Sequence, residues 1–107
     1  MVYMHVTIDC HMGKRDQFSE AFSRRIPVLE SHGWKFLGGW HSVFGRVARV
    51  VHLWELPDAN AYQSVLALPA KDPEFAKVGP AINESVDEEV IEIMTEAPYR
   101  RGSFRTA

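Results

Sequence analysis

The stretch Arg-Val-Val-His-Leu-Trp-Glu at residues 49–55 carries the clearest structural signal in this chain. Alternate residues of a β-strand share a face, so Val50, His52 and Trp54 are expected together on one side of a sheet. The positions between them are also apolar, and charged residues occur only at the two ends of the stretch. A strand with this pattern predicts that both faces of its sheet are covered.

The length and composition fit one soluble domain. A chain of 107 residues can bury a core without disulfides or metal. The formal net charge of -2 argues against nucleic acid as a partner, because the phosphate backbone selects a basic surface. Cys10 is the single cysteine, which fits a reducing compartment. We expect a cytoplasmic protein without membrane contact, since neither a signal-peptide pattern nor an apolar run of roughly 18 residues is present.

Hydrophobic periodicity predicts secondary structure in the order β-α-β-β-α-β. Period-two alternation marks the strands, and a glycine in the short gap between the second and third predicts a hairpin. Gly38 and Gly39 inside the second strand indicate a bulge or a close backbone approach. The four strands are expected over residues 2–9, 34–44, 47–56 and 86–95.

Two helical regions separate these strands. The first is expected over about residues 14–32, and Pro27 should bend it because proline removes a backbone hydrogen bond. The second begins after Asp58, stops at Pro69, and restarts at Asp72, with aspartates as N-caps at both starts.

This order predicts a ferredoxin-like α+β sandwich in which both helical regions cover one face of an antiparallel sheet. Apolar residues of strands two to four would then remain on the other face, because successive side chains alternate. A second copy of the chain is the economical cover, so we expect a homodimer. The domain should span residues 1–98, followed by a flexible basic tail at 99–107.

Three local motifs resemble one known family. They are Ile-Pro-Val-Leu-Glu-Ser-His-Gly at residues 26–33, Val-Val-His-Leu-Trp-Glu at 50–55, and Asp-Pro-Glu-Phe at 72–75. The chain resembles the NIPSNAP family of the dimeric α/β-barrel superfamily over nearly everything from Tyr3 to Pro98. This resemblance implies a dimeric α/β barrel. It implies no particular activity, because the family has no settled biochemical role.

The chain also departs from the family's pattern. The first strand of the family usually carries an arginine and a tyrosine, where this chain has Val6 and Ile8. The second helical region often carries arginines, where this chain has Tyr62 and Leu66. If those arginines bind an anion in other members, this chain lacks that means of binding one.

His52 is the leading candidate for a site residue, with two interpretations. It could be a general base, because burial keeps an imidazole neutral near pH 7. It could instead be a core histidine whose ring nitrogens bond to protein groups, which is the commoner situation and the interpretation favoured here. In the first case we expect a ligand pocket lined by His52, Trp54, Tyr62 from the second helical region, and His5 from the first strand. Burial beside aromatic rings should lower the pKa of His52.

A metal or cofactor is not predicted. His5, His41 and His52 lie on neighbouring strands, which makes a metal site conceivable. Their spacing matches no ligand motif, and nothing marks a haem ligand. We therefore expect a protein that needs no metal, haem or other cofactor.

Three functional hypotheses remain. The first is a NIPSNAP-like homodimer of unassigned biochemical role, with a pocket between sheet and helices for a small apolar or aromatic ligand. The second is a cofactor-independent monooxygenase or isomerase of the dimeric α/β-barrel superfamily that uses His52 as its base. The third is a pure protein-interaction module. The sequence leaves open whether the protein is an enzyme.

Overall fold

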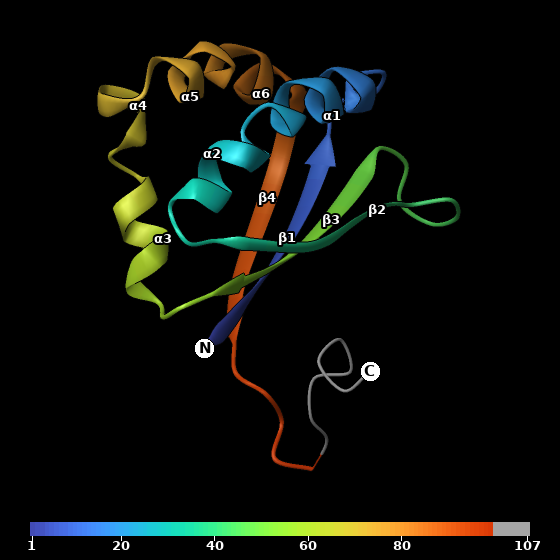
Figure 1. The fold of residues 1–107 in the computed structure, drawn as a ribbon. Helices are drawn as coiled ribbons and strands as arrows, with labels where there is room; N and C mark the ends of the chain where they lie inside the picture. Colours follow the sequence, from blue (N-terminus) through green and yellow to red (C-terminus); the bar gives the residue numbers. More distant parts are fainter. Residues whose placement is uncertain (100–107) are drawn as a thin grey trace.

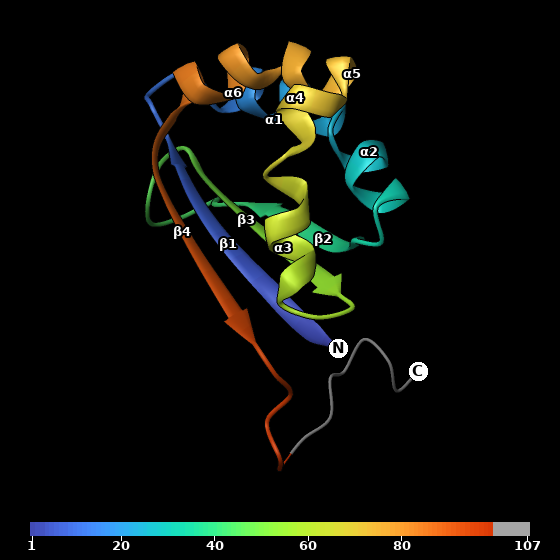
Figure 2. The same cartoon turned by 90° about the vertical axis from the view of Figure 1, so that its left-hand side faces the viewer.

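The computed structural model describes residues 1–99, which form a four-stranded antiparallel sheet with the helices gathered on one side (Figures 1 and 2). The strand order is β2-β3-β1-β4, which confirms the ferredoxin-like α+β sandwich. From residue 100 onward, the expected basic tail lies outside the described residues. No helix within residues 1–99 is long and apolar enough to cross a bilayer. The strands are β1 (Val2–Cys10), β2 (Lys35–His41), β3 (Arg49–Leu56) and β4 (Val86–Met94).

The paired part of the hairpin between β2 and β3 is shorter than predicted, and its loop is longer. β2 ends at His41 rather than near residue 44, and β3 begins at Arg49 rather than 47. The residues between form a loop in which Gly45 and Ala48 both adopt positive φ, of 94° and 61°. Backbone in this left-handed region cannot continue a strand, so the pairing stops earlier than the apolar pattern suggested.

The first helical region is two helices, α1 (Arg15–Ser23) and α2 (Ile26–Ser31), instead of one bent helix. The break falls at residues 24–25, before Pro27. Pro27 lies in the first turn of α2, where its missing N–H costs no helical hydrogen bond. The proline thus starts a new helix and does not bend an existing one.

The second helical region consists of four short helices. Asp72 is an N-cap as predicted: its Oδ1 accepts hydrogen bonds from the backbone N–H groups of Glu74 and Phe75, at 3.0 and 3.2 Å. Asp58 is not the N-cap of the first of these helices, because that position is Ala59, but its Oδ1 accepts hydrogen bonds from the N–H groups of Asn60 and Ala61. The helices are α3 (Asn60–Val65), α4 (Leu68–Lys71), α5 (Pro73–Lys77) and α6 (Gly79–Ser85).

The register of the sheet assigns each strand residue to one of two faces. Val6 lies opposite His52 and Met4 opposite Trp54, and all four are buried beneath the helices. We call this side the helix-covered face. The other side, the open face, has no helix over it within residues 1–99 (Figure 2). The open face includes Trp40, Val51, Leu53 and Val90.

Candidate functional site

His52 projects from β3 into a group of phenylalanine rings on the helix-covered face. Its ring centroid lies 4.7 Å from that of Phe22, 5.5 Å from Phe36 and 6.0 Å from Phe18. Phe18 and Phe22 come from α1, whereas Phe36 comes from β2. The imidazole is therefore enclosed by aromatic surfaces from two elements, and only 7% of the residue is exposed.

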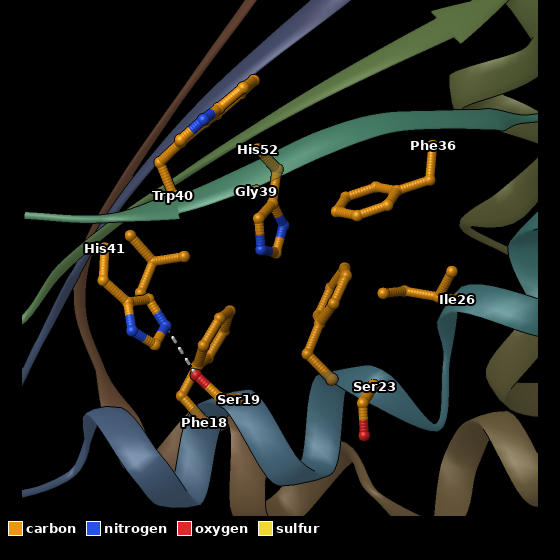
Figure 3. Close-up of a pocket in the computed structure, with 11 residues that line it drawn as sticks. Phe18, Ser19, Ser23, Ile26, Phe36, Gly39, Trp40, His41 and His52 are labelled. Atoms are coloured by element: carbon orange, nitrogen blue, oxygen red, sulfur yellow. Dashed lines mark hydrogen bonds between the residues drawn. The ribbon is translucent and has the colours of Figure 1, made fainter.

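An open cleft of about 440 Å³ lies between α1 and the strands β2 and β3. We call it the outer cleft. Figure 3 shows the His52 ring extending into it, with Phe36 to its right, Phe18 below it, and Ser19 and His41 to its left. Trp40 contributes to the rim, but its side chain extends toward the opposite side of the strand (Figure 3). The walls are mainly aromatic and aliphatic, with Ser19 and His41 at one end and Ser23 farther along α1 (Figure 3).

A second cavity, of about 130 Å³, lies deeper between the sheet and the helices α2, α3 and α5. We call it the inner cavity. His52, Trp54 and Tyr62 all line it. Trp34 stands at its wall, edge-on to Trp54 and stacked on Tyr62, with centroid distances of 5.4 and 6.2 Å. His52 and Phe22 line both spaces and separate them.

The ring of His52 makes no hydrogen bond to any group among residues 1–99. In the same part of the chain, no side-chain nitrogen or oxygen is both sealed from solvent and without a partner. The ring nitrogens that lack a protein partner are therefore reachable through a cavity. The expectation of a core histidine bonded to protein groups is not met, because aromatic rings surround this histidine and leave its nitrogens available.

Burial is the main reason why the pKa of His52 is lowered from 6.5 to about 4, and the nearby His41 contributes a smaller part. A positive charge among phenylalanine rings would lose its hydration, so the neutral imidazole is favoured. At pH 7 the ring therefore has one nitrogen that donates a hydrogen bond and one that accepts.

Gly39 shapes the outer cleft. A Cβ at this position would lie 3.1 Å from the Phe36 ring and 3.2 Å from the His52 ring, closer than ordinary contact. The pairing of β2 with β3 also shifts between Phe36 and Gly38. The two glycines predicted either a bulge or a close approach to the backbone; the register shift is at Gly38 and the close approach is at Gly39.

His5 does not join the other residues proposed for the pocket. It lies opposite Leu53 on β3, so its side chain is on the open face, whereas Val6 is the residue opposite His52. A shift of one residue in register moves every side chain to the other face, and the register is not readable from the sequence. The prediction that His5 lines this pocket is therefore wrong, while His52, Trp54 and Tyr62 line one cavity.

The structure does not bring three histidines together. His41 pairs with Ser19, whose Oγ lies 3.1 Å from Nε2 of His41 at the edge of the outer cleft. No group of three His, Cys, Asp or Glu side chains within residues 1–99 is arranged to hold a metal ion. Cys10 is buried, and burial raises the pKa of its thiol, so the reactive thiolate is disfavoured.

Arg25 is a lining residue of the inner cavity that the sequence did not single out. It lies at the break between α1 and α2, and its guanidinium is fixed by Phe75, fifty positions along the chain. Phe22 was not singled out either, yet it lines both spaces. The one available signal for Arg25 was its spacing, three residues after Phe22 and four before Leu29, which places an arginine on the apolar side of the helical region.

Comparison with known proteins places this geometry in context. The family model described as NIPSNAP matches residues 3–101. A solved NIPSNAP family protein with unknown function from Agrobacterium tumefaciens is 21% identical, with a TM-score of 0.79, covering 94% of this chain and 91% of that one. An uncharacterized NIPSNAP domain protein from Burkholderia xenovorans is 18% identical, with a TM-score of 0.76, covering 95% and 100%.

A cofactor-independent oxygenase from Streptomyces nogalater has the same fold at greater distance. It is 15% identical, with a TM-score of 0.64, and the alignment covers 95% of each chain. No curated protein matches this chain. Identities at this level show a shared fold and leave the chemistry of the site to be argued from its own residues.

Proposed function

The chain belongs to the NIPSNAP family, and on that premise we propose that it is a homodimeric protein that binds a small aromatic molecule between its sheet and helices. The observation that carries this proposal is the state of His52. Its ring is almost fully buried, has no protein hydrogen-bond partner among residues 1–99, and borders two cavities. Buried polar groups are normally paired, so a ligand is the natural partner.

The walls around His52 select the chemical class of that ligand. Three phenylalanine rings surround the imidazole, and such rings favour stacked or edge-on contacts with another aromatic ring. A single hydroxyl on the ligand would satisfy the accepting nitrogen of His52. Concave, mostly apolar pockets with a few polar groups are typical small-molecule sites. Phenol is therefore the simplest probe.

The low pKa of His52 favours binding over catalysis. A general base is most effective when its pKa lies near the working pH, and a pKa of about 4 makes this imidazole a weak proton acceptor at neutrality. Hydrogen bonding requires no proton transfer and is unaffected by this weakness. We therefore place binding ahead of enzymatic activity.

The open face supports the dimer. Trp40 on β2 is 50% exposed, and Val90 on β4 is 44% exposed. Val51 and Leu53 lie on the same face, on the intervening strand β3. A stable protein interface buries roughly 1,600 Å² in total. Sheet-to-sheet packing of two copies would cover these side chains and leave both helix-covered faces free for ligand.

The binding proposal is tested by titrating the protein with phenol and following tryptophan fluorescence, because Trp34 and Trp54 line the inner cavity. We expect saturable quenching that His52→Ala removes. His5→Ala is the matched control, since it deletes the same ring from the open face, and we expect it to retain binding. Equal effects of the two substitutions, or no saturable binding by the unmodified protein, would overturn the proposal. The second of these results would favour a pure interaction module.

A cofactor-independent oxygenase is the second candidate, favoured by the fold shared with the Streptomyces nogalater enzyme. His52 would then accept a phenolic proton, which requires that the bound substrate raise its pKa. Oxygen uptake with hydroquinone tests this alternative. Turnover that depends on His52 would establish it, and binding without oxygen uptake would exclude it for that substrate.

A further inference from the structure

Arg25 is held in a fixed position at the wall of the inner cavity. Its Nε and Nη2 donate hydrogen bonds to the carbonyl oxygen of Phe75, at 3.2 and 3.0 Å. The guanidinium carbon also lies 3.9 Å above the centroid of the Phe75 ring. Gly79 allows this position, because a Cβ there would lie only 3.2 Å from Nη2. The guanidinium is thus oriented before any ligand arrives.

The charge of Arg25 has no counter-ion among residues 1–99. A guanidinium has five N–H donors, and the Phe75 carbonyl uses two of them. The remaining donors, both on Nη1 and one on Nη2, meet no carboxylate within ion-pair distance in this part of the chain. The side chain is half-buried, and this burial lowers the pKa of Arg25 without neutralising it. A partly desolvated charge that lacks a counter-ion and keeps unused donors can receive an external anion.

The size and walls of the inner cavity limit that anion to a small planar acid. Its volume of about 130 Å³ is similar to the roughly 150 Å³ of an engineered apolar cavity that holds benzene. Trp34, Trp54 and Tyr62 provide aromatic walls beside Arg25. An arginine fork matches the two oxygens of a carboxylate, as a lysine does not.

We infer that the inner cavity binds a small aromatic carboxylic acid, with the ionised carboxylate on Arg25 and the ring between the tryptophans and His52. This inference rests on the proposed function, because it names the ligand class of the same pocket.

Glu89 is the other charged residue that lines the inner cavity. It is solvent-exposed on β4, and partial desolvation raises the pKa of its carboxyl. The same desolvation favours the neutral form of this carboxyl, and only its ionised form repels an anionic ligand. Glu89→Gln should therefore strengthen benzoate binding.

Benzoate and benzamide form the test pair, because both are planar and of nearly the same size but only benzoate is charged at pH 7. Titrations followed by calorimetry and tryptophan fluorescence should show that benzoate binds at least about tenfold more tightly, as one charge-assisted hydrogen-bonded pair implies. Equal affinities for the two probes would overturn this inference while leaving the proposed function standing. If neither benzoate nor benzamide binds, this inference and the proposed function are both overturned.

Arg25→Met should reduce benzoate affinity about tenfold and leave benzamide affinity nearly unchanged. Arg24→Met is the matched control, because Arg24 is exposed and pairs with Glu20 through Nη2 at 2.6 Å. Arg25→Lys is a second variant for the case in which Arg25→Met does not fold without the Phe75 contacts. It retains the positive charge and should fold. This variant should lower the affinity for benzoate several-fold, since an ammonium cannot bond to the Phe75 carbonyl and bind both oxygens of a carboxylate at the same time. A benzoate-to-benzamide ratio that is the same in the Arg25 variants as in Arg24→Met would overturn the inference.

Discussion

The two faces of the sheet are built by the same strands but have opposite properties. On the helix-covered face, Trp54 is 1% exposed and packs against Trp34 and Phe36, while the His52 ring nearby lacks a protein partner among residues 1–99. On the open face, Trp40 is half exposed, and the polar groups include a closed ion pair between Asp9 and Arg49 at 2.8 Å. The first face thus has a buried imidazole without a protein partner among residues 1–99, and the second has exposed apolar side chains.

The largest expected difference between the faces is in the free energy of unfolding. Trp54→Ala should cost about 3–5 kcal/mol, because it removes a fully buried ring and leaves a cavity. Trp40→Ala, measured on dilute protein, should cost about 1 kcal/mol or less, because its ring is half in solvent. Urea denaturation of both variants measures this difference. Similar losses for the two would show that the open face is as important to the fold of one chain as the helix-covered face.

The next largest difference between the two faces should be in how the free energy of unfolding depends on pH. The unfolded chain binds a proton at His52 below pH 6.5, whereas the folded chain does so only near pH 4, so stability is lost as the pH falls between these values. The full loss is on the order of 3 kcal/mol. His52→Phe should remove this part of the pH dependence in urea denaturation at pH 7, 5.5 and 4.5. A profile unchanged by the substitution would show that the pKa of His52 is ordinary.

The Asp9 carboxyl on the open face titrates in a different window. The Arg49 guanidinium that donates two hydrogen bonds to it holds the pKa of Asp9 below its ordinary value of 3.8. The stability from this pair is fully present above that value and is lost only as the pH falls further. Asp9→Asn should therefore leave the slope of unfolding free energy against pH unchanged between pH 7 and 4.5. This variant is the open-face control for His52→Phe.

Oligomeric state should respond to the open face. We expect a homodimer by light scattering at micromolar concentration, and Trp40→Asp should weaken it at least about tenfold by placing a charge in apolar surface. Benzoate binding should persist in the resulting monomer, because Trp40 does not line the inner cavity. An unmodified protein that is monomeric under these conditions would contradict the dimer.

The smallest expected effect concerns the outer cleft alone. Gly39→Ala adds one methyl group against the Phe36 and His52 rings, at separations that require both to shift by a few tenths of an ångström. Phenol affinity should fall several-fold with little change in the midpoint of urea denaturation. Gly38→Ala is the matched control, since its Cβ would meet Trp40 on the open face and not the cleft.

The sequence predicted the fold well because the signals it depends on are local. Alternation along β3 was sufficient to put His52 and Trp54 on one face, and the aspartate at 72 marked a helix start. The missed features depend on contacts between distant residues. His5 was assigned to the wrong face because one residue of register decides it, and Arg25 was overlooked because its contact with Phe75 forms only in the folded chain.

The central claim is that the nitrogens of His52 are the hydrogen-bonding groups of a ligand site. Nuclear magnetic resonance of protein with ¹⁵N-labelled histidines reports on each imidazole directly during a phenol titration at pH 7. We expect a neutral His52 ring whose nitrogen shifts change and saturate with phenol, while the His5 shifts on the open face stay constant. A charged His52 at pH 7, or nitrogen shifts that do not respond to phenol, would contradict the account.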